Sequence, residues 1–160
     1  MTIITVTALE GRLSLAQRRL LAESLTDAVL EPEVGQLAPA ARQGFQVHFR
    51  SLAADCMAIG GKLLSDQETP RDVMTVNIAV MNAAWPAEVR AQVIRNVLAR
   101  LAEACGMQKP SSTWWVNFEI IEEGSWGSRG GVLSILDLLD SGVFTPARIK
   151  AIRDASAPAN

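Results

Sequence analysis

Hydrophobic and polar residues follow one order along the first half of the chain. The segment from Thr2 to Leu9 is rich in Ile, Val and Thr, which is typical of a β-strand. Ser14, followed three residues later by Gln17, has the form of a capping box and predicts the start of a helix. Apolar residues with helical spacing then predict one buried helix face, formed by Leu20, Leu21, Leu25, Ala28 and Val29.

The predicted helix is followed by breaks and by a second strand. Pro32, Gly35 and Pro39 interrupt the helical pattern and predict its end. Residues 44–53 alternate apolar and polar side chains, which predicts a strand with one buried face. The strand leads into CMAIGG, residues 56–61, a glycine turn.

The same order recurs after a polar linker, SDQETPRD, which spans residues 65–72. Residues 74–81 predict a strand, and Pro86 suits the first turn of a second helix. STWWVNFEII, residues 112–121, predicts the fourth strand, and EGSWGSRGG, residues 123–131, repeats the glycine turn. The second helix has its own apolar face, formed by Val93, Ile94, Val97, Leu98, Leu101 and Ala102. A shift of 73 residues superimposes the two helical faces, whereas the strands are out of phase by one residue.

Two strand–helix–strand units predict two parallel strand pairs with right-handed crossovers. We therefore predict an α/β (α+β) fold: a tandem β-α-β repeat whose four-stranded mixed sheet carries two helices on one face. The predicted units are residues 1–64 and 73–135, joined by the linker and followed by a helical tail, residues 136–160, in one compact domain. The uncovered face of a mainly apolar sheet predicts burial against other subunits.

Composition narrows the classes of protein to consider. A chain of 160 residues can bury a core without disulfides or metals. Fifteen basic and seventeen acidic side chains give a net charge of −2, so we expect no nucleic-acid partner. Cys56 and Cys105 fit a reducing compartment, and no apolar stretch is long enough for a membrane span. We therefore expect a soluble cytoplasmic protein without membrane contact.

Several catalytic and binding patterns are incomplete. His48 and Cys56 have the residue types of a base and a nucleophile. We do not expect them to act as a pair, because a strand end separates them and no orienting acid is evident. Two cysteines and one histidine do not make a zinc site, and GSRGG lacks the lysine and the helix of a phosphate loop. An acidic strand end offers either a general acid or a solvated surface, at Glu119, Glu122 and Glu123.

Three short motifs resemble the tautomerase superfamily. LEGR, residues 9–12, resembles the start of 4-oxalocrotonate tautomerase, just before its helix. MAIGG, residues 57–61, is similar to the glycine turn of that enzyme and of macrophage migration inhibitory factor. WVNF, residues 115–118, resembles the aromatic–x–Asn–aromatic strand of the latter. The resemblance covers roughly residues 1–135. It implies a homotrimer of tandem β-α-β subunits and proton transfer, without a cofactor, at a carbon next to a carbonyl.

The resemblance places Thr2 where the family has a catalytic amino-terminal proline, exposed by removal of the initiator methionine. A free α-amino group has an ordinary pKa of about 7.7–8.0, which apolar surroundings or a nearby cation lower. The amine of Thr2 is therefore a candidate general base and, as a primary amine, a candidate Schiff-base former. If Met1 is retained, the Thr2 nitrogen is an amide, and the amine of Met1 is displaced by about 3.8 Å.

The resemblance also implies a set of ligand-binding residues. Arg12 would bind a substrate carboxylate, unless it is a solvated turn arginine. Arg42 corresponds to a lysine that lines the pocket in the inhibitory-factor branch. Trp115 and Asn117 share one strand face, and the asparagine would donate to an enolate oxygen; a buried interface aromatic is the alternative for Trp115. Trp126 would form an apolar wall, unless it only packs the glycine turn.

Two functions from different classes remain open on these residues. The first is cofactor-free keto–enol isomerisation, or related lyase or dehalogenase chemistry, of a small carbonyl acid. In that case Thr2 and Asn117 are catalytic. Arg12, Arg42, Trp115 and Trp126 then bind the substrate. The second is a non-catalytic trimeric scaffold, for small-molecule binding or structure, that has lost the catalytic proline. Threonine at position 2 favours the scaffold, and the polar pocket residues favour the enzyme.

Overall fold

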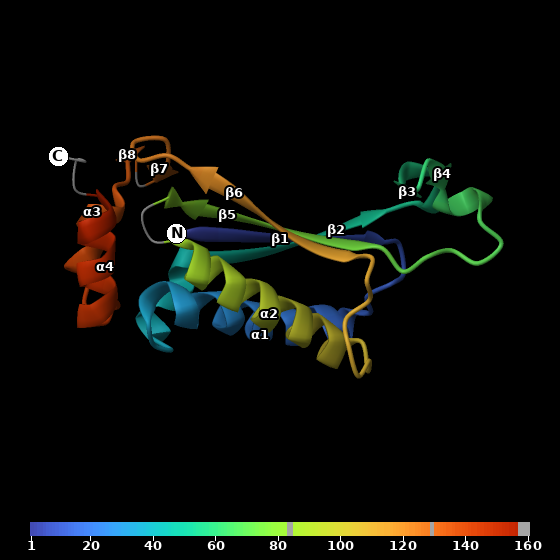
Figure 1. The fold of residues 1–160 in the computed structure, drawn as a ribbon, viewed down its shortest axis with the longest axis horizontal. Helices are drawn as coiled ribbons and strands as arrows, with labels where there is room; N and C mark the ends of the chain where they lie inside the picture. The colour runs from blue at the N-terminus through green and yellow to red at the C-terminus, as the bar shows by residue number, and fades with distance from the viewer. Residues whose placement is uncertain (83–84, 129, 157–160) are drawn as a thin grey trace.

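Four long strands form one mixed sheet in the computed structural model, which describes residues 1–82, 85–128 and 130–156 (Figure 1). β1 (Thr2–Leu9) pairs in parallel with β2 (Phe45–Leu52), and β5 (Met74–Met81) pairs in parallel with β6 (Trp114–Ile121). β1 and β5 run antiparallel at the centre, so the strand order is β2-β1-β5-β6. The predicted mixed sheet is confirmed.

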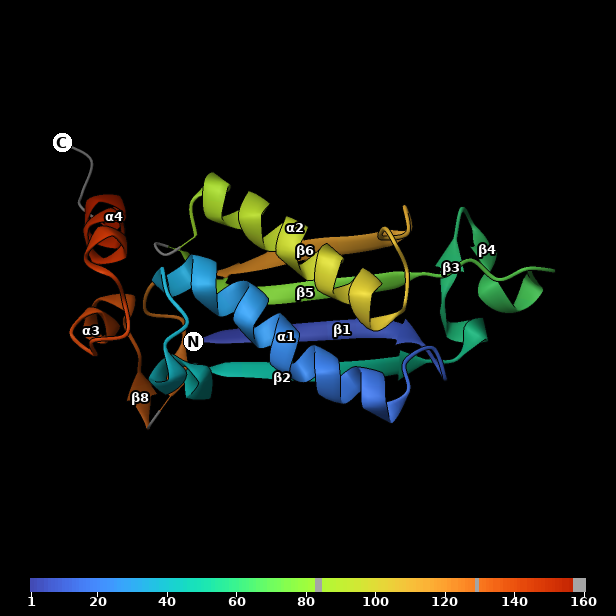
Figure 2. The same cartoon turned by 90° about the horizontal axis from the view of Figure 1, so that it is seen from below.

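Both long helices lie side by side on the same face of the sheet (Figure 2). They are α1 (Leu15–Val34) and α2 (Ala87–Ala104). The core fills the space between the two layers. The predicted helix faces are buried or, at Ile94 and Leu98, half-buried, except at Leu20, which is 50% exposed. The buried residues Leu21 and Leu25 correspond to Val93 and Val97, a shift one residue smaller than the sequence pattern suggested, and the strands share this smaller shift.

The start of α1 follows the predicted capping box. The Gln17 amide donates to Ser14 Oγ at 3.2 Å, and the Ser14 amide donates to Gln17 Oε1 at 2.9 Å. Helix α2 begins one residue later than expected, because Pro86 is its N-cap rather than part of its first turn.

Helix α1 runs through Pro32, where the sequence pattern predicted a break, and ends at Gly35. A proline has no backbone N–H, so the carbonyl of Ala28 loses its helical partner. The Asn96 side-chain amide of α2 donates to that carbonyl at 3.3 Å. The neighbouring helix thus satisfies the group that the proline frees, and this keeps α1 continuous.

The two glycine turns form short hairpins at opposite ends of the sheet (Figure 1). Gly60 and Gly61 have positive φ in the first turn, and Arg129 in the second turn lies outside the described residues. The hairpins consist of β3 (Ala58–Ile59) with β4 (Lys62–Leu63), and of β7 (Gly127–Ser128) with β8 (Gly131–Val132). The described residues include the 3₁₀ turns η1 (Pro39–Gly44), η2 (Ala54–Cys56) and η3 (Leu64–Asp66).

The tail packs across the end of the sheet where β1 and β2 begin (Figures 1 and 2). It contains α3 (Ile135–Leu139) and α4 (Pro146–Ser156), and residues 157–160 lie outside the described part. The Thr145 amide donates to the Val34 carbonyl at 2.9 Å. A Cβ added to Gly35, which has φ +87°, would lie 2.4 Å from Thr145 Oγ1. The end of α1 and the tail therefore meet at a point where only glycine fits.

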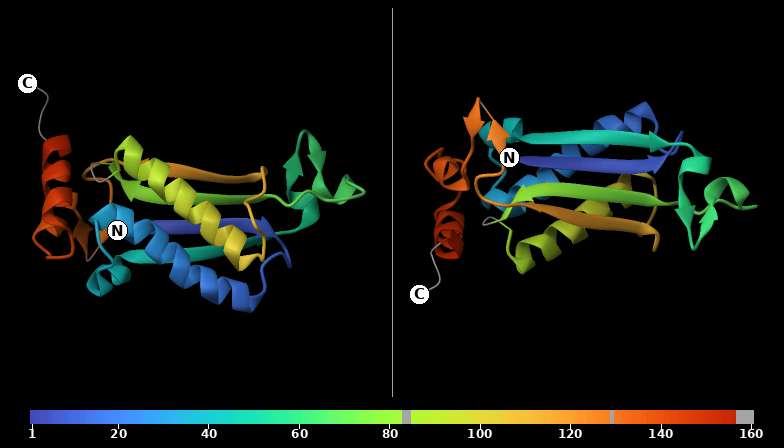
Figure 3. Two further views of the ribbon diagram at one scale, coloured as in Figure 1. Left: turned by 60° about the horizontal axis from the view of Figure 1, so that its bottom comes forward. Right: turned by 90° about the horizontal axis from the view of Figure 1, so that it is seen from above.

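The second face of the sheet carries no helix (Figure 3, right). The expectation of a mainly apolar face is wrong, because polar and apolar side chains are mixed on it. Trp115 is the large apolar side chain that stands out there, with 56% of its surface exposed. The polar residues of this face include Thr5, Thr7, Gln46, His48, Arg50, Thr75, Asn77, Asn117 and Glu119.

Candidate functional site

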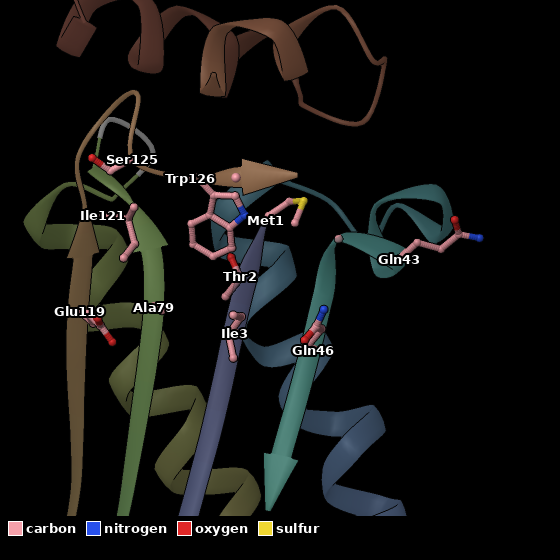
Figure 4. A pocket seen from close by; sticks show the side chains of 12 residues that line it. Met1, Thr2, Ile3, Gln43, Gln46, Ala79, Glu119, Ile121, Ser125 and Trp126 are labelled. Carbon is pink, nitrogen blue, oxygen red and sulfur yellow. The ribbon is translucent and has the colours of Figure 1, made fainter. Parts of the chain in front are cut away.

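A cavity of about 390 Å³ opens on the uncovered face at the start of β1 (Figure 4). Its volume lies in the range of small-molecule sites, about 300–1,000 Å³. The amino-terminal residues line it, together with residues of β2, β5, β6 and the loop after β6. The lining residues are Met1, Thr2, Ile3, Gln43, Gly44, Gln46, Ala79, Glu119, Ile121, Ser125, Trp126 and Gly127.

Strand register explains why distant residues meet in this cavity. Ile3 pairs with Gln46 on one side and with Ala79 on the other, and Ala79 pairs with Glu119. Residues at paired positions of a sheet project to the same face. The four side chains therefore form one row across the sheet, with an amide and a carboxylate on the two outer strands (Figure 4).

Trp126 lies over the amino-terminal end of β1 (Figure 4). The side chain is 8% exposed, and the Trp126 carbonyl accepts a hydrogen bond from the Leu133 amide at 2.8 Å. Sequence reasoning named Trp126 and Thr2 as site residues, and the structure brings both into one cavity.

Thr2 itself is almost fully buried, at 1% exposure. The alternation of β1 directs its side chain toward the helices, and its hydroxyl donates to Glu33 Oε2 at 3.0 Å. Met1 is half-buried and lines the cavity beside it. Removal of Met1 would place a free amine on the residue that the hydroxyl anchors.

Glu33 is a buried carboxylate that sequence reasoning missed. Burial raises its pKa, and the positive charge of the amino terminus is the strongest opposing influence. The Thr2 hydroxyl, the Trp85 indole and Arg148 also favour the ionised carboxylate, although the Trp85 N–H completes no ordinary hydrogen bond with the described residues. A signal existed in the sequence, because Glu33 continues the four-residue spacing of the buried face through Val29.

A second cavity of about 420 Å³ lies on the other side of Met1, between the sheet end and the tail. Glu33, Phe45, Leu133 and Phe144 are among its lining residues, and Met1 lines both cavities. The amino-terminal residue therefore lies between a cavity on the uncovered face and a second cavity walled in part by the tail.

Arg12 lies at the opposite end of β1 from the cavity. Its Nε and Nη2 donate to the two carboxylate oxygens of Asp72 at 2.7 and 2.8 Å, and its guanidinium lies 5.7 Å from the Trp114 ring centroid. The hydrogen bond with Asp72 raises the pKa of Arg12. Within one chain, the structure does not bring Arg12 to Thr2.

Arg42 lies on η1 and forms an ion pair with Asp27 of α1. Both residues line a small cavity of about 140 Å³ that is separate from the amino-terminal one. The residue after Arg42, Gln43, lines the amino-terminal cavity instead. Sequence reasoning missed Gln43 and Gln46, because an amide in a polar loop or on a polar strand face carries no distinctive pattern.

Trp115 and Asn117 share the uncovered face of β6, as predicted from their spacing. Asn117 Nδ2 donates to Asn77 Oδ1 at 3.4 Å. Neither residue lines the amino-terminal cavity, although Glu119, two positions further along the same face, does. Within one chain more than half of the surface of Trp115 is exposed, so its alternative role as a buried aromatic at a subunit interface stays a prediction.

Other candidate chemistry is weak in the structure. His48 Nε2 contacts Gln46 Oε1 at 3.1 Å, and a hydrogen bond with Asp55 raises the pKa of the Cys56 thiol, which makes it a poor nucleophile. Glu122 accepts from Asn82 and Glu123 from the Ile135 amide. Within residues 1–82, 85–128 and 130–156 there is no cluster of three metal-ligating side chains and no helix that could span a membrane.

Comparisons with known proteins identify the architecture. No family model and no curated protein matches the sequence. Solved structures match over nearly their whole length. One is N1, a member of the cis-3-chloroacrylic acid dehalogenase family, with a TM-score of 0.68 and 18% identity, covering 95% of this chain and 99% of that chain. The chain has a tautomerase-like fold.

Two further structures extend the comparison. The symmetric trimer of Q0 fused 4-OT has a TM-score of 0.64 and 20% identity, covering 82% of this chain and 94% of that chain. Leishmania major MIF2 has a TM-score of 0.61 and 12% identity, covering 83% of this chain and 97% of that chain. The TM-scores show a shared tautomerase-like fold, and at identities of 12% and 20% the matches show the fold alone.

Proposed function

We propose that this chain is a member of the tautomerase superfamily that catalyses keto–enol isomerisation, or a related reaction, of a small carbonyl acid without a cofactor. The observation that carries the proposal is the position of the amino-terminal residues. They line a cavity of ligand size beside an indole, an amide and a carboxylate, on a fold shared with 4-OT and cis-CaaD structures.

The proposed step uses the amine of Thr2 once Met1 is removed. The amine takes a proton from the carbon next to the substrate carbonyl, so a C–H bond breaks and an N–H bond forms. The electron pair moves to the carbonyl oxygen and gives an enolate, which takes a proton on oxygen to give the enol, and the reverse steps convert an enol into the ketone. Trp126 keeps the amine in apolar surroundings, and Gln46 supplies an amide donor.

A homotrimer is part of the proposal. No lysine or arginine is among the described residues that line the cavity, so a substrate carboxylate would need a cation from elsewhere. Arg12 and Arg42 remain the candidates, together with Asn117 as an enolate donor and Trp115 as a wall, each reaching the cavity from a neighbouring subunit. A cytoplasmic location remains an expectation from the free cysteines.

A second function is favoured by a specific observation. Thr2 is buried and its hydroxyl is bound to Glu33, while the described lining of the cavity includes a carboxylate and no lysine or arginine. This arrangement also suits a trimeric scaffold that binds a small molecule, or serves structure alone, without using its amino terminus as a base.

Turnover of a simple enol, phenylenolpyruvate, distinguishes the two functions. An intact mass first establishes whether Met1 is present in the purified protein. We expect the protein without Met1 to convert the enol, and we expect the Thr2→Pro variant, also without Met1, to convert it at least as fast. An inert wild type beside an active variant would favour the scaffold. Inertness of both folded proteins would reject the cavity as an active site.

A further inference from the structure

Glu33 occupies a position that is unfavourable for a carboxylate and contributes nothing evident to the core. It is the penultimate residue of α1, where the negative end of the helix dipole disfavours an anion, and no basic residue stands in that last turn. It is also 2% exposed, and burial of a charge without partners is costly. A group held under such conditions needs specific partners.

The partners come from three separate segments. Thr2 on β1 donates its hydroxyl at 3.0 Å, and the amino terminus contributes a positive charge. Trp85, just before α2, and Arg148 on α4 also favour the ionised form, and the Arg148 Nε donates to the Glu33 carbonyl at 2.9 Å. Glu88 acts on Arg148, so it belongs to the same group of charges.

The geometry connects Glu33 directly to the proposed base. Only three covalent bonds separate the Thr2 nitrogen from the Thr2 oxygen that contacts the carboxylate. Glu33 and Met1 also line the same cavity on the tail side of the amino terminus. The amino-terminal charge that favours the Glu33 anion is carried by Met1, and removal of Met1 would place that charge on Thr2, whose hydroxyl contacts the carboxylate.

We propose that Glu33 is the positioning residue of the amino-terminal amine. Its carboxylate fixes Thr2 through the hydroxyl, and its negative charge stabilises the ammonium group that forms when the amine takes a proton from substrate. This deepens the proposed function and rests on it. Glu33 touches no reacting atom; it sets where the amine points and how strongly the amine holds a proton.

The test measures the amine without needing turnover. Cyanate carbamylates only the uncharged amine, so the pH midpoint of amino-terminal labelling, followed by peptide mass, reports how firmly the amine holds its proton. We expect Glu33→Gln to lower this midpoint by about one pH unit or more, as removal of a nearby opposite charge does. The control is Glu31→Gln, which neutralises an exposed carboxylate two residues away and leaves the midpoint unchanged. An unchanged midpoint in folded Glu33→Gln would overturn the proposal.

A second pair of variants tests the positioning role if Glu33→Gln does not fold. Thr2→Val removes the hydroxyl at nearly constant size, and Thr2→Ser keeps it. We expect Thr2→Val to lower kcat about ten-fold with little change in KM, because the amine loses its orientation, and Thr2→Ser to retain activity. Equal kcat values in both variants would reject the positioning role. A shifted labelling midpoint without any turnover would instead reject the proposed function and keep the link between Glu33 and the amine.

Discussion

At the scale of single residues, a buried acid that the sequence pattern did not reveal contacts Thr2 behind the candidate site. Glu33 stands where the apolar face of α1 continues, at four-residue spacing from Leu21 through Val29, and its charge made it look like a surface position. Thr2 and Trp126 were predictable because motifs and chain position marked them. Arg12 and Arg42 were chosen by the same resemblance, yet each already has a carboxylate partner away from the cavity.

The buried acid predicts an unusual dependence of stability on pH. Burial raises the pKa of Glu33 above the ordinary value of about 4.3, so the folded state binds its proton more tightly than the unfolded state does. This contribution to stability is fully present below the ordinary pKa and is lost as pH rises through the folded-state pKa. The groups that face the carboxylate, namely the amino terminus and Arg148, limit the loss but do not reverse its sign.

The matched variants are again Glu33→Gln and Glu31→Gln. In urea unfolding at a series of pH values from 4 upward, we expect wild type to lose stability relative to Glu33→Gln as the pH rises. Wild type and Glu31→Gln should follow parallel curves. A constant difference between wild type and Glu33→Gln across the series would show that burial does not control this carboxylate.

At the scale of elements, local signals predicted the start of α1 better than its end. The Ser14 capping box and the strand alternation act between neighbours in the chain, so the sequence contains them. The passage of α1 through Pro32 depends on Asn96, which lies on another helix. The residues around a proline in the sequence therefore do not determine whether a helix ends there or continues through it.

The junction between α1 and the tail gives a prediction at this scale. Gly35 and Gly11 both have positive φ, but only Gly35 has another segment against it. We expect Gly11→Ala to cost about 1–2 kcal/mol through backbone strain alone. Gly35→Ala should cost more, because its Cβ also displaces Thr145 and Arg148. Thermal or urea unfolding compares the two, and equal losses would show that the tail is not packed tightly on α1.

At the scale of the whole molecule, the parallel strand pairs followed from the repeat, but the strand order and the cavity did not. Parallel pairing within each unit is dictated by the crossovers, whereas the antiparallel junction of β1 with β5 brings Ala79 and Glu119 to the amino terminus. The pairing between the units joins strands that are far apart in the sequence, so local patterns do not determine it. The sequence identified chemistry-bearing residues one at a time, and only the register showed which of them share a row.

The proposed trimer predicts a role for the uncovered face. Trp115 exposes more than half of its surface there, which suits a subunit contact. We expect Trp115→Asp to convert the trimer to smaller species in sedimentation equilibrium, because it buries an unpaired charge in the interface. Leu15→Asp is the control: Leu15 is 62% exposed at the start of α1, in the helical layer, and its variant should remain trimeric. A monomeric wild type would refute the assembly.

The surroundings of Glu33 also bear on where this chain can be divided. If the two units were separated at residues 65–72, one fragment would contain Thr2 and Glu33, and the other would contain Trp85 and Arg148. In the first fragment the carboxylate of Glu33 would be exposed to water, and the end of α1 would no longer contact the tail. During synthesis, the surroundings of Glu33 would be complete only after α4 has left the ribosome. The repeat visible in the sequence therefore describes how each unit folds locally, and not where the protein can be cut.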